Sequence, residues 1–154
     1  AAVRGPVAVR VYIEPARAIR DTLGGLWPPH IPKFPQAKGD LGERLKQAML
    51  EAPPGPVIFI GADAPAIRPH HLRDAVRALR HKGAVFGPAN DGGFWLFGLS
   101  HQLRQPEIFD EVRWSTLHAM EDVWSALPDE AHVTLLPQLV DIDTAQDWKT
   151  YIKQ

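Results

Sequence analysis

The sequence contains no cysteine among its 154 residues. This absence excludes a disulfide framework, a zinc site built on thiolates and a cysteine nucleophile. An excess of either charge is also lacking, because 17 Lys and Arg residues oppose 18 Asp and Glu residues. A protein that binds nucleic acid needs a clustered basic surface. The balanced charge therefore predicts no nucleic-acid partner.

Long hydrophobic runs are missing as well. No apolar stretch reaches the roughly 18 residues that a membrane-spanning helix requires. The opening residues 1–6 contain no apolar segment of the kind found in secretory signal peptides. We therefore expect a cytoplasmic protein without a membrane span. The length suits one compact domain covering residues 1–154.

Strand-like and helix-like patterns alternate along the chain. Apolar and β-branched runs predict strands at 7–13, 57–60, 84–86, 94–99 and 133–136, and apolar residues at helical spacing predict helices at 41–52, 70–81, 116–127 and 145–152. This alternation predicts an α/β fold, a three-layer sandwich around a mostly parallel sheet. The link between the strands at 84–86 and 94–99 is too short to join parallel strands, so one antiparallel or bent element is expected there.

Local signals set several boundaries of these elements. Asp40 and Glu43 form the pattern of a capping box at the start of the first helix. Gly83 is expected to end the second helix as the residue after its C-cap. The proline-rich stretch at 27–35 predicts a loop. The continuous apolar run at 57–60 predicts a strand covered on both faces.

Acidic residues recur shortly after the predicted strands. Asp63, Asp91 and the pair Asp141 and Asp143 each follow one. Ligands of open α/β sheets bind beyond the carboxyl ends of the strands, so these carboxylates are expected at one rim. Mg²⁺ or Mn²⁺ would neutralise their mutual repulsion and would also hold a substrate diphosphate.

Glycines flank two of these acids. Gly61 precedes Asp63, and Gly92 and Gly93 follow Asp91, so a ligand could approach the main chain closely. No dinucleotide-binding fingerprint or P-loop pattern is present.

Each acid also has a purely structural interpretation. Asp63 could form an Asx-turn, Asp91 could belong to an ordinary hairpin turn, and Asp143 could support a helix cap at Thr144. Trp114 lies in a predicted turn, which leaves both a core position and a substrate contact open.

Several motifs, taken together, carry a resemblance to a known family. They are Gln36 with GDLGERL at 39–45, IGADAP at 60–65, Gly87-Pro88-Ala89 with DGGFWL at 91–96, WST at 114–116 and DIDT at 141–144. In this order they resemble a bacterial family of inferred GT-A-type glycosyltransferases, long catalogued as a domain of unknown function. The resemblance covers nearly the whole chain.

The resemblance implies a nucleotide-diphospho-sugar transferase fold and a set of site residues. Asp63 matches the strand-end aspartate that binds the metal, and Asp143 matches a second metal contact. Asp91 would be the catalytic base. Gly92, Gly93 and Trp114, together with Gly61, Ala62 and Pro65, would contact the substrate.

One part of the family pattern has no counterpart in this sequence. Members begin with a strand and a basic loop, so the domain is expected to lack its first βα unit at the N-terminus. Three functions remain open on the sequence. They are glycosyl transfer from a nucleotide-sugar, nucleotidyl transfer to a phosphorylated small molecule, and a degenerate domain kept for binding. The oligomeric state is open as well.

Overall fold

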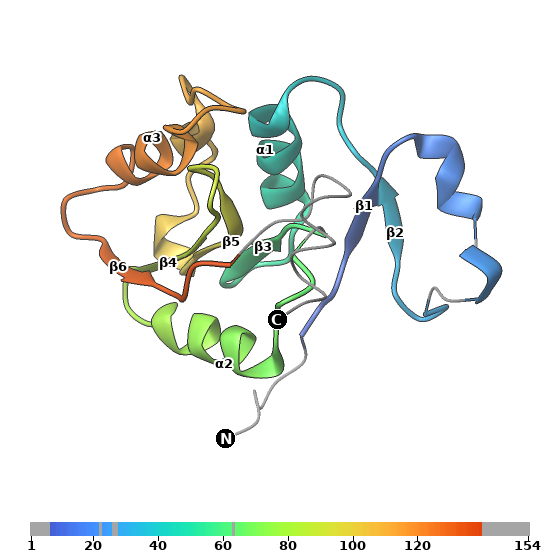
Figure 1. Ribbon diagram of the computed structural model, residues 1–154, viewed down its shortest axis with the longest axis horizontal. Coiled ribbons are helices and arrows are strands. Elements are labelled where there is room, and N and C mark those ends of the chain that lie inside the picture. The colour runs from blue at the N-terminus through green and yellow to red at the C-terminus, as the bar shows by residue number, and fades with distance from the viewer. Residues whose placement is uncertain (1–6, 22, 26–27, 63, 140–154) are drawn as a thin grey trace.

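The computed structural model describes residues 7–21, 23–25, 28–62 and 64–139 (Figure 1). Its strands form two sheets. The smaller sheet pairs β1 (Val11–Ile13) with β2 (Lys33–Pro35) in parallel. The larger sheet has the order β3-β5-β4-β6, with β3 at Val57–Ile60, β5 at Phe94–Leu99, β4 at Gly83–Pro88 and β6 at His132–Leu135.

Strand β5 runs against its neighbours in the larger sheet. It pairs in antiparallel fashion with both β3 and β4, whereas β4 pairs in parallel with β6. Strands β3, β4 and β6 therefore share one direction, and β5 opposes them. This arrangement confirms both the mostly parallel sheet and the antiparallel element expected at the short link.

Helices cover both faces of the larger sheet. Helices α1 (Leu41–Glu51) and α3 (Ala119–Ser125) lie on one side, and α2 (Pro69–Ala78) lies on the other (Figure 1). Met49 and Val123 pack with Phe86 and Phe97 in the first core. In the second core, Ala75 packs among residues that include Val85 and Trp95. The three-layer α/β sandwich is confirmed.

Short 3₁₀ helices fill several of the connections. They are η1 (Ala16–Arg20), η2 (Leu23–Gly25), η3 (His101–Leu103) and η4 (Pro106–Phe109). Both η3 and η4 add buried side chains to the first core, namely Leu103, Ile108 and Phe109.

Helix α1 is fixed at both of its ends. Asp40 accepts a hydrogen bond from the amide of Glu43 at 3.0 Å, as the capping pattern predicts. At the other end, the guanidinium of Arg104 donates to four carbonyl oxygens, those of Met49, Ala52, Pro53 and Gly55. One arginine thereby satisfies main-chain acceptors that the end of a helix leaves without partners.

Two predictions about strands were wrong in part. The proline-rich stretch was predicted as a loop, yet its last residues form β2 beside β1. Pro35 is tolerated because it ends an edge strand of a small sheet. The run at 57–60 is a strand, and it lies at the end of the strand order of its sheet. Ile60 is 48% exposed, so the strand is not covered along its whole length on both faces.

Two helix boundaries also differ from the predictions. Gly83 does not cap α2, because His81 and Lys82 already take left-handed conformations and Gly83 pairs with His132 in β4. The helix predicted from residue 116 begins at Ala119 instead. The helix predicted at 145–152 lies outside the described residues.

Candidate functional site

Two of the predicted site segments meet at one rim of the larger sheet. The amide of Gly61, directly after β3, donates to the carbonyl oxygen of Trp95 at 3.0 Å. Trp95 is the second residue of β5, and Asp91, Gly92 and Gly93 immediately precede that strand. The antiparallel direction of β5 therefore brings the end of β3 beside the turn that begins β5.

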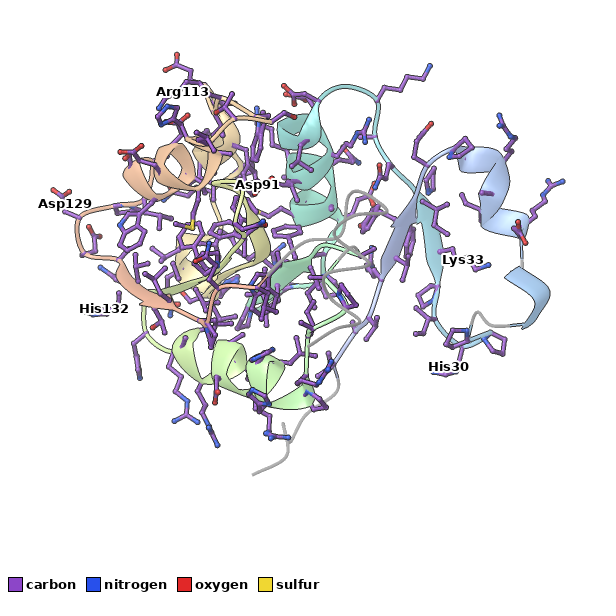
Figure 2. All side chains as sticks on the ribbon, viewed as in Figure 1. His30, Lys33, Asp91, Arg113, Asp129 and His132 are labelled. Carbon is purple, nitrogen blue, oxygen red and sulfur yellow. The ribbon has the colours of Figure 1, made fainter. Side chains whose placement is uncertain are left out.

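The turn at 89–93 contains Asp91, an exposed residue that Figure 2 labels. The amide of Ala89 donates to the carbonyl oxygen of Gly93 at 3.0 Å and closes the turn. Within it, Oδ1 of Asp91 accepts a hydrogen bond from the Gly93 amide at 2.9 Å. The turn interpretation is thus correct, and it orients the carboxylate. Across the described ranges, no hydrogen bond to Oδ2 of Asp91 is found.

Gly92 anchors this turn against the segment that precedes α3. Its carbonyl oxygen accepts a hydrogen bond from the Met120 amide at 3.1 Å. Its φ is +86°, and a Cβ at this position would lie 2.3 Å from the carbonyl oxygen of Leu117. Only glycine combines this left-handed backbone with such a close approach.

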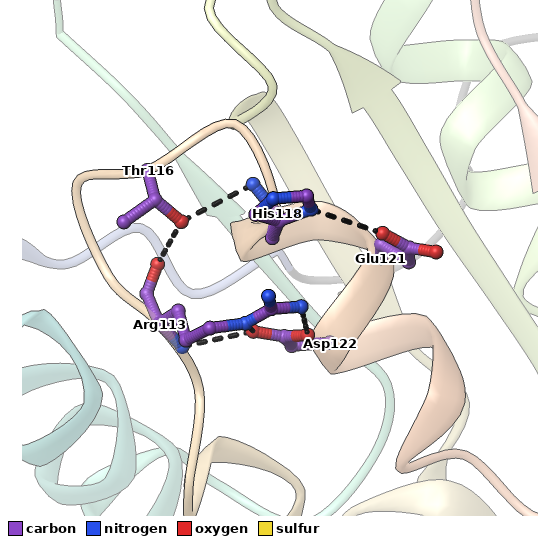
Figure 3. Close-up of polar contacts among 5 residues, drawn as sticks. All are labelled: Arg113, Thr116, His118, Glu121 and Asp122. Carbon is purple, nitrogen blue, oxygen red and sulfur yellow. Dashed lines mark hydrogen bonds and ion pairs between the residues drawn. The ribbon is translucent and has the colours of Figure 1, made fainter.

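A polar network fixes the segment that Gly92 touches (Figure 3). Arg113 and Asp122 form a two-pronged ion pair, with Nε–Oδ2 at 2.8 Å and Nη2–Oδ1 at 2.6 Å. This pairing lowers the pKa of the Asp122 carboxyl to about 2. Thr116 donates to the Arg113 carbonyl oxygen, and His118 contacts Glu121 at 3.3 Å. The network links the segment before α3, which Gly92 contacts, to the first turns of that helix.

Trp114 lies partly within the core. Its ring packs near those of Phe94 and Phe109, with centroid distances of 6.4 and 6.2 Å. A Cβ on Gly42 would lie 2.6 Å from its Nε1, so glycine in α1 leaves room for the indole. The core interpretation applies in part, because the side chain is half-buried. Its predicted substrate contact stays a prediction.

The N-cap residue of α2 binds the main chain of the loop that follows β3. Gly61, Ala62 and Pro65 are exposed, and Asp63 lies outside the described residues. Nη1 of Arg68 donates to the carbonyl oxygens of Pro65 and Ile67 at 2.9 and 3.1 Å.

Helix α2 starts with an unusual reciprocal cap. The Arg68 amide donates to Nδ1 of His71 at 3.1 Å, and the His71 amide donates to the Arg68 carbonyl oxygen. His71 stands where a capping box places Glu or Gln. Burial against Trp95 lowers the pKa of His71, since burial disfavours the charged imidazole.

The chain after β6 returns to the same rim. Leu139 forms a β-bridge with Ala89, and the side-chain Nε2 of Gln138 donates to the Ala89 carbonyl oxygen. The Trp95 indole donates to the Pro137 carbonyl oxygen. Asp141 and Asp143 come next in sequence and lie outside the described residues. Within the described part of the chain, no group of three His, Asp or Glu side chains is placed to hold a metal. No helix there is long and apolar enough to cross a membrane.

Comparison with known proteins places the chain in a family. A family model whose description reads "uncharacterized protein conserved in bacteria", DUF2064, matches residues 1–116. The chain belongs to the DUF2064 family. The matched residues include Asp63, the 89–93 turn and Trp114, whereas Asp143 lies beyond them.

A solved structure shares the fold of this DUF2064 member. It is a protein of Desulfovibrio desulfuricans G20, provisionally named a nucleotide-diphospho-sugar transferase, with a TM-score of 0.79 and 29% sequence identity. The match covers 96% of this chain and 66% of that protein, so the DUF2064 chain spans just under two thirds of its neighbour's length. Among curated proteins, none matches the chain.

Sequence reasoning missed two features of the rim. The first is the role of Trp95, a core residue 1% exposed, whose carbonyl oxygen accepts from Gly61 and whose indole donates to Pro137. The second is the reciprocal cap of Arg68 and His71. Its only signal in the sequence is a histidine at the position of the capping-box Glu.

Proposed function

We propose that this DUF2064 member is a glycosyltransferase that uses a nucleotide-diphospho-sugar donor and a divalent cation. The observation that carries the proposal is the meeting of the Gly61 loop and the Asp91 turn at one rim, joined through Trp95. The provisional name of the structural neighbour supports the same class of donor.

Asp91 is the proposed general base. The Gly93 amide donates to Oδ1 of this exposed residue, and Oδ2 would take the proton of an acceptor hydroxyl. As that proton moves to Asp91, the acceptor oxygen bonds to the anomeric carbon, and the bond from that carbon to the diphosphate oxygen breaks. The products are the glycosylated acceptor and a nucleoside diphosphate.

Asp63 and Asp143 are the proposed ligands of Mg²⁺ or Mn²⁺. Carboxylate oxygens suit these hard cations. When bound, the cation would offset the charge of the departing diphosphate. Gly61, Ala62 and Pro65 would line the donor side of the rim. Gly92, Gly93 and Trp114 would line the acceptor side.

Calorimetric titration of nucleotide-diphospho-sugars, with and without Mn²⁺, tests the binding half of the proposal. We expect binding that depends on the cation and that D63N abolishes. The D129N variant is the matched control, because Asp129 is an exposed carboxylate on the α3–β6 connection (Figure 2). Binding that D63N leaves unchanged would refute the metal assignment.

Turnover tests the catalytic half. Removing a general base costs about 10²–10⁴-fold in rate, so D91N should lose kcat while donor binding persists. Release of pyrophosphate from nucleoside triphosphates, with no transfer from nucleotide-sugars, would favour nucleotidyl transfer instead. If no nucleotide or nucleotide-sugar binds, the domain is a binding module and the proposal fails.

A further inference from the structure

The sequence from Arg68 to Lys82 concentrates positive charge. It contains the basic residues Arg68, Arg73, Arg77, Arg80 and Lys82, and Asp74 is its only acid. The whole chain has a net charge of −1, so the remainder is distinctly acidic. The overall balance therefore conceals a local basic segment, most of which is helix α2.

Arg73 and Arg77 lie on the outer face of this helix, and Arg80 lies in the bend just after it. The inner face buries His71 and Ala75 against the sheet. All three arginines are exposed, and the spacing of four residues places Arg73 and Arg77 on one side of the helix. Figure 1 shows α2 as the outermost layer on its side of the sheet, and nitrogen-tipped side chains project outward from it in Figure 2.

Few acids neutralise this stripe, defined here as Arg73, Arg77 and Arg80. Arg77 pairs with Asp74 at 2.8 Å, and both side chains are well exposed. Within the described residues, neither Arg73 nor Arg80 forms an ion pair. The stripe therefore keeps a net positive charge.

We propose that the outer face of α2 docks on an anionic lipid bilayer. Basic residues near an anionic bilayer are attracted to its surface, each adding to the attraction, and the stripe supplies three exposed arginines. Guanidinium groups suit phosphates because they can donate two parallel hydrogen bonds. Val76, 37% exposed between the arginines, adds an apolar contact at the headgroup boundary. This docking is independent of the proposed transferase activity.

A bilayer fits this face better than a nucleic acid does. The stripe lies on the outer side of α2 and the bend after it, on the outermost layer of its side of the sheet (Figure 1). Its exposed residues at 73, 76, 77 and 80 include no Phe, Tyr or Trp on which a base could stack.

Co-sedimentation of the full chain with lipid vesicles tests the proposal. Vesicles of phosphatidylcholine alone are compared with vesicles containing about one third phosphatidylglycerol, at low and at high salt. Each basic residue near an anionic surface contributes about fivefold in partitioning. The triple variant R73Q/R77Q/R80Q should therefore lose roughly a hundredfold in binding to the anionic vesicles.

The matched control removes the same charge elsewhere. R17Q/R20Q/K38Q changes three exposed basic residues of the N-terminal part and should bind like the unmodified chain. Thermal melts of both variants establish that each is folded. Binding that high salt abolishes, that neutral vesicles do not show and that only the α2 variant loses would support the proposal.

Three results would overturn it. They are the absence of sedimentation with anionic vesicles, an equal loss in both triple variants, and tighter binding to duplex DNA than to vesicles. The last result would assign the stripe to nucleic acid.

Discussion

Replacing Gly92 with alanine tests whether the Asp91 turn is locked against the segment before α3. Gly92 has φ +86°, and a Cβ there would lie 2.3 Å from the Leu117 carbonyl oxygen. The left-handed backbone alone costs an alanine about 1–2 kcal/mol. Relieving the contact requires the main chain at Leu117 to move by roughly 1 Å, and overpacking of this kind costs about 1–3 kcal/mol more.

Gly25 offers a matched control. Its φ is +88°, almost the same as at Gly92, yet a Cβ there would meet no atom within 4 Å. G25A therefore isolates the backbone cost, and the difference between the two variants measures the contact with Leu117. We expect G92A to unfold at a temperature roughly 3–6 °C below that of G25A, which corresponds to about 1.5 kcal/mol.

Differential scanning calorimetry of the unmodified chain, G25A and G92A measures this difference directly. Equal unfolding temperatures for the two variants would refute the close packing of Gly92 on Leu117. A second readout is the rate of glycosyl transfer. G92A should lower this rate more than G25A does, because Gly92 lies in the Asp91 turn.

Three further predictions concern the supports of the rim. Burial lowers the pKa of His71, so its contribution to stability is full above the unfolded pKa of about 6.5 and falls as the pH drops through the folded pKa. The H71Q variant keeps a capping acceptor but does not titrate, so it should flatten this pH dependence in urea titrations at several pH values. D122N should lower the unfolding temperature more than the exposed control E121Q does, and the stability that Asp122 confers should be lost as the pH falls from its unfolded pKa towards about 2. R104K should lose about 2–3 kcal/mol in chemical unfolding, because one ammonium cannot satisfy the four carbonyl oxygens that the guanidinium binds, and an unchanged midpoint would contradict this role.

The features that the sequence predicted well depend on local signals. The cap of α1 needs only Asp40 and its neighbours within one helical turn, and the structure contains that bond. The strands at 57–60 and 94–99 have the predicted bounds because each is an unbroken apolar run. The antiparallel element followed from the length of one connection, which leaves no room for a crossover.

The features that sequence reasoning missed depend on partners distant in sequence. Strand β2 exists because it pairs with β1, where Val11 faces Lys33, and its own residues carry little strand signal. The position of Trp114 depends on the space left by Gly42 in another element. A chain reversal through His81 and Lys82, both left-handed without being glycine, has no simple sequence signature.

The candidate site shows the same difference between features with local signals and features that depend on distant partners. The prediction from strand ends placed four acids at one rim. The bond between Gly61 and Trp95 places the Gly61 loop beside the Asp91 turn. Asp63, Asp141 and Asp143 lie outside the described residues. The cap of Arg68 by His71 was not predicted, because it depends on a side-chain geometry that few sequences use. The metal ligands Asp63 and Asp143 stay predictions.

The position of β5 between β3 and β4 has a consequence for the newly synthesised chain. Among the described residues, strand β3 pairs with β5 alone, about forty residues later in the sequence, so it leaves the ribosome well before this partner exists. At typical rates of synthesis this delay is roughly 2–8 s. During that time Val57–Ile60 is an unpaired segment of high β-propensity, the kind that promotes aggregation. Pro53, Pro54 and Pro56 before it and Pro65 after it resist strand extension, and so they protect β3 until β5 arrives.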